Sequence, residues 1–178
     1  MKSVIALPLV LAALLSACVS QEPFKPATPQ QFNEAQNAVS ICGRHAPDWD
    51  AISNALNEVG YTATENPRFI SIQKSQAAEI LEKQETGVVV LLGSRGREGA
   101  CIVGLEGMSP PQGLELAQSW VKRFAALTNA ERGQGLARNV VQAWGAKDKE
   151  RIVYIAAYNS WDVIENRGAA ARLLYIRK

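Results

Sequence analysis

Apolar residues in the first third of the chain recur at helical spacing. Two sets follow this spacing and each is closed by a glycine: Phe32, Ala35, Val39, Cys42 and Gly43, then Trp49, Ile52, Leu56, Val59 and Gly60. A repeat every three or four residues is typical of an amphipathic helix, and glycine commonly follows a helix end. The pattern predicts two helices joined by a short loop, with Cys42 on the inner face of the first.

The next segment predicts a short extended piece at Tyr61 to Thr64, a strand at Arg68 to Gln73 and a helix over residues 75–84. The helix is favoured because Ser75 is a good N-cap residue. Ala78 and Leu81 are spaced to share one helical face.

Two β-rich apolar runs, Val88 to Leu92 and Ala100 to Leu105, enclose the glycine-rich segment GSRGREG. Such a pair predicts a β-hairpin. A phosphate-binding loop would need a helix directly after the first strand, and here a second strand follows. The glycines are therefore expected to serve the backbone angles of a wide turn. An anion site stays open as the alternative, because Arg95 and Arg97 at the tip could meet a carboxylate or phosphate group of a partner.

Ser109, Pro110 and Pro111 begin another predicted helix, since a cap residue precedes proline in the first turn. Three strand-like runs follow: Leu136 to Trp144, Arg151 to Tyr158 and Ala171 to Ile176. They predict an antiparallel meander. The fold class expected is α+β, with a helical hairpin and an antiparallel sheet of about five strands in ββαβββ order covered on one face by helices.

The N-terminus has the pattern of an export signal. Lys2 precedes an apolar run over residues 4–15 that contains Pro8. A membrane-spanning helix needs about 20 apolar residues, so this shorter run suits the core of a signal peptide.

Leu15, Ser16, Ala17 and Cys18 match the lipobox, and in these residues the chain resembles a bacterial lipoprotein precursor. The resemblance implies a diacylglyceryl group on the Cys18 sulfur, cleavage before Cys18 and a fatty acyl chain such as palmitate on the new amine. Val19 stands where an aspartate would retain the protein in the inner membrane, so the periplasmic face of a Gram-negative outer membrane is implied. The alternative is cleavage after Ser20, which would release an unlipidated protein.

The domain organisation expected is a signal peptide at 1–17, a lipidated cysteine and proline-rich tether at 18–30, and one globular domain at 31–178. The tether contains Pro23, Pro26 and Pro29, which favour an extended spacer. At about 3.1 Å per residue, it would reach roughly 35 to 40 Å from the lipid.

The charge balance and the number of cysteines limit the classes of function that the chain can have. The chain has 19 Lys and Arg against 17 Asp and Glu, and the leader would remove one basic residue, Lys2. No nucleic-acid partner is expected from this balance. Cys42 and Cys101 remain as a pair in an exported protein and predict a disulfide, whose loop of about 60 residues is worth about 4 kcal/mol of chain entropy. Two buried thiols, or a catalytic Cys42 with His45 as base, are the alternatives.

No catalytic set stands out in the sequence. One histidine and a bonded cysteine pair do not supply a zinc site, so no metal or cofactor is expected. The carboxylates near apolar segments that could do acid and base work are Glu98, Glu106, Asp148 and Asp162. Trp161, at the start of a long loop, is a candidate for an exposed partner contact.

These observations predict a lipid-anchored periplasmic domain that acts as a non-enzymatic binding or accessory subunit of an envelope assembly. A cell-wall hydrolase that uses carboxylates, and a small-molecule-binding lipoprotein with a site between the long helix and the sheet, are the alternatives.

Overall fold

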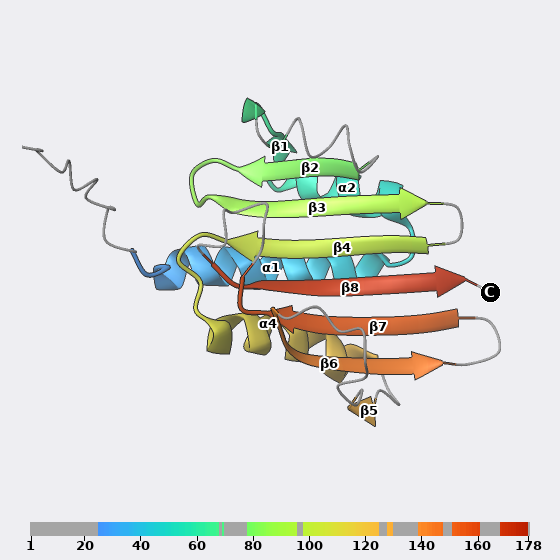
Figure 1. The fold of residues 1–178 in the computed structure, drawn as a ribbon. Helices are drawn as coiled ribbons and strands as arrows, with labels where there is room; N and C mark the ends of the chain where they lie inside the picture. The colour runs from blue at the N-terminus through green and yellow to red at the C-terminus, as the bar shows by residue number, and fades with distance from the viewer. Residues whose placement is uncertain are drawn as a thin grey trace, which may run out of the picture.

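The computed structural model describes residues 25–67, 69, 78–95, 98–124, 128–129, 139–147, 151–160 and 168–177. Its strands form one antiparallel sheet in the order β1-β2-β3-β4-β8-β7-β6-β5, with the helices behind it in Figure 1. The strands are β1 (Thr62–Ala63), β2 (Ala78–Lys83), β3 (Val88–Arg95), β4 (Glu98–Leu105), β5 (Thr128–Asn129), β6 (Val140–Lys147), β7 (Arg151–Tyr158) and β8 (Ala170–Arg177). The helices are α1 (Pro29–His45), α2 (Trp49–Glu58) and α4 (Pro110–Arg123).

The two predicted N-terminal helices are confirmed. Thr28 caps α1 in a capping box with Gln31, and Pro29 occupies the first turn, where no amide donor is lost. The predicted apolar faces are turned inward and bury Ala35, Val39, Cys42, Ile52 and Leu56. Val59, expected on the inner face of the second helix, instead follows the end of α2 and is exposed. Gly60 follows α2 with a φ of 92°, a conformation that favours glycine.

The helix predicted over residues 75–84 is wrong, because Ala78–Lys83 is strand β2 and pairs with β3 along its whole length. Ile80 and Leu81 are adjacent and both buried, at 0% and 1% exposure, on opposite faces of the sheet. Hydrogen bonding to β3 and burial on two faces override the helix preference of Ala, Glu, Leu and Lys. The strand predicted at 68–73 lies outside the described residues except for Phe69.

The predicted hairpin is confirmed: β3 and β4 pair antiparallel from Val88 opposite Leu105 to Arg95 opposite Glu98. Since β4 follows the turn directly, the glycine-rich segment does not precede the helix that a phosphate loop requires. Gly99 has a packing role instead of the expected turn role. A Cβ atom there would overlap the indole of Trp49 on α2.

The C-terminal half follows the predicted ββαβββ order only in part, because the unexpected strand β5 lies between α4 and the three strands of the meander. Ser109 caps α4 in a capping box with Gln112, and β6, β7 and β8 form the expected meander. The α+β class is therefore confirmed, but the expected count of about five strands is too low. The described sheet has eight strands, because β2 was mistaken for a helix and the two-residue strands β1 and β5 are too short to show alternation.

The helices cover one face of the sheet and form the main core with it. That core joins the inner faces of α1, α2 and α4 to buried residues of β3, β4, β7 and β8, among them Val90, Cys101, Val103, Ile155 and Leu173. The face turned away from the helices carries two smaller buried clusters, one around Ile80, Val89 and Leu91 and one around Val140, Ala143 and Ala156.

The chain enters the domain beside the turn between β4 and α4. The backbone N–H of Ala27 donates to the Gly107 carbonyl at 3.0 Å. Gly107 has a φ of 81°, and a Cβ atom there would overlap the backbone of Lys25 and Ala27. Residues 25–27 therefore lie against the domain at this turn.

Candidate functional site

The predicted disulfide between Cys42 and Cys101 is confirmed. Both residues are fully buried, their Cα atoms are 6.4 Å apart, and the bond ties α1 to β4 in the middle of the sheet. Because both sulfurs are bonded, Cys42 is not available as a nucleophile for His45, which lies in the last turn of α1.

The predicted partner contacts are only partly described. Arg95 ends β3 at the hairpin tip, opposite Glu98. Arg97 and Trp161, together with the lipidation residue Cys18, lie outside the described residues.

Glu98 and Glu106 do not form a catalytic carboxylate pair. Glu98 begins β4 and Glu106 follows its end, so the rise of an extended strand separates them by about 25 Å. Glycosidase carboxylates lie within about 10 Å of each other. The other two candidates, Asp148 and Asp162, lie outside the described residues.

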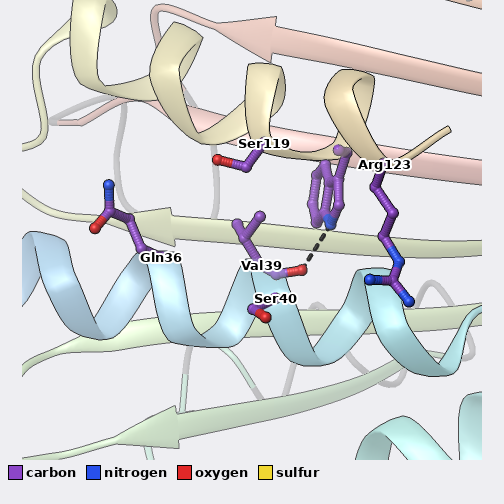
Figure 2. A pocket seen from close by; sticks show the side chains of 6 residues that line it. Gln36, Val39, Ser40, Ser119 and Arg123 are labelled. Atoms are coloured by element: carbon purple, nitrogen blue, oxygen red, sulfur yellow. Dashed lines mark hydrogen bonds between the residues drawn. The ribbon is translucent and has the colours of Figure 1, made fainter. Parts of the chain in front are cut away.

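A pocket that the sequence did not indicate lies between α1 and α4. It has a volume of about 200 Å³ and is lined by Gln36, Val39, Ser40, Ser119, Trp120 and Arg123. Figure 2 shows these side chains, which come from the facing sides of the two helices. We call it the α1–α4 pocket.

Close helix packing shapes this pocket. A Cβ atom on Gly43 would come within 2.9 Å of the Trp120 ring, so glycine allows α4 to approach α1. The buried Trp120 Nε1 donates to the Val39 carbonyl at 2.7 Å, and Arg123 Nε donates to the Gly43 carbonyl at 2.7 Å. These two bonds hold the indole and the guanidinium against α1, and Figure 2 draws the one that ends on the Val39 carbonyl.

The lining chemistry suits binding more than catalysis. The six residues offer hydroxyl, amide and guanidinium groups, and none of the six is a thiol, an imidazole or a carboxylate. A serine hydroxyl is a weak nucleophile without an adjacent base. The pocket can therefore form hydrogen bonds to a polar or anionic group, and its lining residues do not supply a general base.

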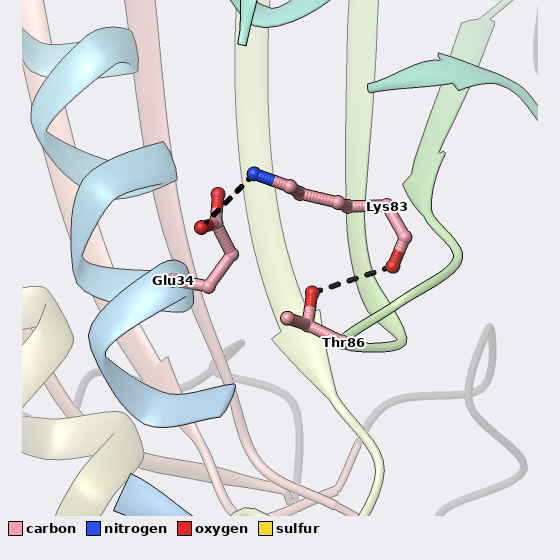
Figure 3. Close-up of polar contacts among 3 residues, drawn as sticks. All are labelled: Glu34, Lys83 and Thr86. Atoms are coloured by element: carbon pink, nitrogen blue, oxygen red, sulfur yellow. Dashed lines mark hydrogen bonds and ion pairs between the residues drawn. The ribbon is translucent and has the colours of Figure 1, made fainter. Parts of the chain in front are cut away.

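A second polar cluster joins α1 to β2 (Figure 3). Lys83 Nζ lies 3.2 Å from Glu34 Oε2 and 5.7 Å from the centre of the Tyr61 ring. The neighbouring turn is fastened to α1, because Gln31 Nε2 donates to the Thr86 carbonyl at 2.9 Å. Thr86 in turn donates to the Lys83 carbonyl.

Tyr61 lies at the bottom of this cluster and is 1% exposed. Burial raises the pKa of its hydroxyl above the usual value, and the negative charge of Glu34 raises it further. The Tyr61 hydroxyl and Glu34 Oε1 are both buried and have no hydrogen-bonding partner other than each other, and this contact also raises the pKa of Tyr61. A tyrosine that keeps its proton this firmly is a poor general base, so the cluster is assigned a structural role.

Within the described residues, no three metal-ligating side chains lie close enough to hold an ion, and no helix has the length and hydropathy of a membrane span. No protein-family model, curated protein or solved structure matches the chain.

Proposed function

We propose that this chain is an exported, lipid-anchored domain on the periplasmic face of the outer membrane, where it binds an envelope protein without catalysing a reaction. The proposal starts from the lipobox at Leu15 to Cys18. The observation that carries it in the structure is the buried bond between Cys42 and Cys101, because disulfides persist in oxidising compartments such as the periplasm.

The point where the chain enters the domain decides which end of the sheet would lie near the membrane. Lys25 already lies against the turn at Gly107, so at most the residues between Cys18 and Lys25 can act as a free spacer. At about 3.1 Å per residue they span roughly 20 Å, which is shorter than the reach of the whole proline-rich segment. The Gly107 end of the sheet would therefore stay near the membrane.

The hairpin end of the same sheet would point away from the membrane. Arg95 ends β3 and Glu98 begins β4, so both lie at the other end of this hairpin from Gly107, and Figure 1 shows this end opposite the start of α1. A rigid sheet that holds charged residues roughly 25 Å from its anchored edge suits contact with a protein partner in the periplasm. This geometry supports a binding role for Arg95.

The anchor is tested by mass spectrometry of the N-terminal peptide from the membrane fraction of cells that make the full chain. We expect a peptide that begins at Cys18 and carries acyl chains, and we expect Cys18→Ala to move the protein to the soluble fraction. A mature N-terminus after Ser20 without lipid would contradict the proposal.

The binding role is tested by chemical crosslinking of intact cells followed by detergent extraction. We expect one envelope protein to be recovered in stoichiometric amount with the wild-type chain. Recovery of the monomer only, under conditions that capture a known envelope complex, would contradict the proposal.

A small-molecule-binding function is a second candidate, and the α1–α4 pocket favours it. Its volume of about 200 Å³ and its Arg123 guanidinium suit a small anionic ligand. The thermal unfolding temperature of the purified domain, measured with citrate, phosphate or acetate, would distinguish the small-molecule-binding function from the protein-binding function. A stabilisation that disappears in Arg123→Gln would support this second function.

A further inference from the structure

The strand register places one arginine at the centre of the sheet face that the helices leave uncovered. Arg172 on β8 lies opposite Ile102 on β4 and opposite Ala156 on β7, and β8 is a central strand. Ile102 and Ala156 belong to the clusters on the face away from the helices, so Arg172 lies on that face too.

The surroundings of Arg172 are apolar and aromatic. Leu174 follows it on the same face of β8, and Tyr154 and Tyr158 flank Ala156 on β7. All four side chains are partly buried: Arg172, Leu174, Tyr154 and Tyr158. Burial and the neighbouring Tyr158 raise the pKa of Tyr154, while the positive charge of Arg172 opposes this rise.

Arg172 has no carboxylate partner in the described structure. Its Nε–H is buried and donates a hydrogen bond to no neighbour. Two described carboxylates share this face, but Glu82 is on β2 and receives a hydrogen bond from Thr64. Glu98 lies four residues along β4 from Ile102, at about 13 Å by strand rise.

Burial of the Arg172 Nε without a hydrogen-bond partner costs free energy, and an anion that reached the guanidinium would offset this cost. We propose that Arg172, with Tyr154 and Tyr158, binds an acidic side chain of a partner polypeptide on this sheet face. The guanidinium forms paired hydrogen bonds to a carboxylate, and the two phenol hydroxyls are further donors.

The apolar residues around Arg172 favour a polypeptide over a free small acid. The apolar surface around Arg172 extends over β4, β8 and β7. Its partly buried residues are Ile102, Leu174, Ile176 and Ile152. A small acid would contact the guanidinium only, whereas an Asp or Glu flanked by apolar side chains would also cover these residues. Arginine and tyrosine are frequent centres of protein interfaces. The inference rests on the proposed protein-binding function and names the surface and the partner chemistry.

The test uses a photo-crosslinking amino acid in the full chain in living cells, at Leu174 beside Arg172 or at Gln118 on the exposed side of α4. We expect an adduct with another polypeptide from position 174 and none from position 118, with an Asp or Glu of the partner next to the crosslinked residue. Arg172→Met should lower the yield from position 174 about tenfold or more, and Arg172→Lys should lower it less.

The stability of the same variant separates binding from a structural role. We expect purified Arg172→Met to unfold at the same temperature as the wild type or at a higher one, because the unpaired charge is removed. Tyr158→Phe supplies a second variant that keeps the charge and should weaken the crosslink.

An unchanged yield in Arg172→Met, an adduct only within the chain itself, or an adduct with lipid would overturn the inference. If a partner is captured by general crosslinking but not from position 174, the binding function stands and this surface is wrong.

Discussion

Lys83, Glu34 and Tyr61 show how single residues set the polar interior of this domain. The Lys83 ammonium neutralises Glu34 between α1 and β2, and both side chains are largely withdrawn from water, at 18% and 16% exposure. The Tyr61 hydroxyl beneath them is buried, and its one side-chain partner is Glu34. A buried hydroxyl of this kind adds little to stability at neutral pH, since a single hydrogen bond largely offsets the cost of its desolvation without exceeding it by much.

Tyr61→Phe should therefore change the free energy of unfolding by less than about 1 kcal/mol at pH 7. Its effect should appear in alkali, because the folded pKa of Tyr61 is raised above the value of 10.0 that applies to the unfolded chain. Below pH 10 both states hold the proton, and above it only the unfolded state releases the proton, so stability falls as the pH rises.

Urea unfolding of both proteins between pH 8 and pH 11 would measure this difference. The wild type should lose more stability than Tyr61→Phe above pH 10, while Tyr154 contributes equally to both. Parallel pH profiles would show that Tyr61 does not keep its proton in the folded state.

At the scale of elements, two contacts decide how the segments pack. Gly43 lets Trp120 of α4 reach the backbone of α1, and Gly107 lets the N-terminal segment lie on the turn after β4. Both positions depend on the absence of a Cβ atom. The packing of these elements is therefore sensitive to the addition of one methyl group.

Trp120→Phe should destabilise the domain by about 2 kcal/mol, because it removes the hydrogen bond to the Val39 carbonyl and part of a buried side chain. Chemical unfolding followed by far-ultraviolet circular dichroism would measure this loss. Ser119→Ala, a change at an exposed neighbour on the same helix, is the control and should stay within about 0.5 kcal/mol. Equal stability of Trp120→Phe and the control would show that this hydrogen bond adds nothing.

Gly107→Ala should release residues 25–27 from the domain, and Gly87→Ala provides a matched control. Both glycines have positive φ, at 81° and 71°, but only a Cβ on Gly107 would meet other atoms within 4 Å. Limited proteolysis with chymotrypsin should cut after Phe24, the residue before this segment, faster in Gly107→Ala than in the control. Equal rates would show that backbone strain, rather than the contact with Lys25 and Ala27, governs this turn.

At the scale of the whole molecule, one covalent bond joins the helical layer to the centre of the sheet. The residues that it links are 59 positions apart, and both are fully buried. A loop of this length corresponds to about 4 kcal/mol in the chain-entropy account. That value is a large share of the stability of a domain of this size, which is typically 5 to about 15 kcal/mol.

The double variant Cys42→Ala/Cys101→Ala should therefore unfold at a markedly lower urea concentration, with a loss of up to about 4 kcal/mol. Thiol labelling of the denatured wild type without reductant should find neither Cys42 nor Cys101 reactive. Reductant should lower the stability of the wild type and leave the double variant unchanged. Labelling of either cysteine in the oxidised wild type would contradict the disulfide.

The sequence by itself determined the features that are local or compositional. Helical periodicity identified α1 and α2, and the Ser109 and proline pattern identified the start of α4. β-rich apolar runs between turn signals identified β3, β4 and the C-terminal meander. Pairing the last two cysteines followed from their number and from the export signal. Each of these features is indicated either by residues within one segment or by the number of cysteines in the chain.

Only the tertiary structure decided the features that depend on a neighbour distant in sequence. β2 is a strand because β3 supplies its hydrogen bonds and two layers bury Ile80 and Leu81, which local preference does not encode. The α1–α4 pocket and the position of Arg172 at the centre of the face turned away from the helices likewise arise from helix packing and strand order. These are long-range contacts, and a segment read by itself does not contain the partner that completes them.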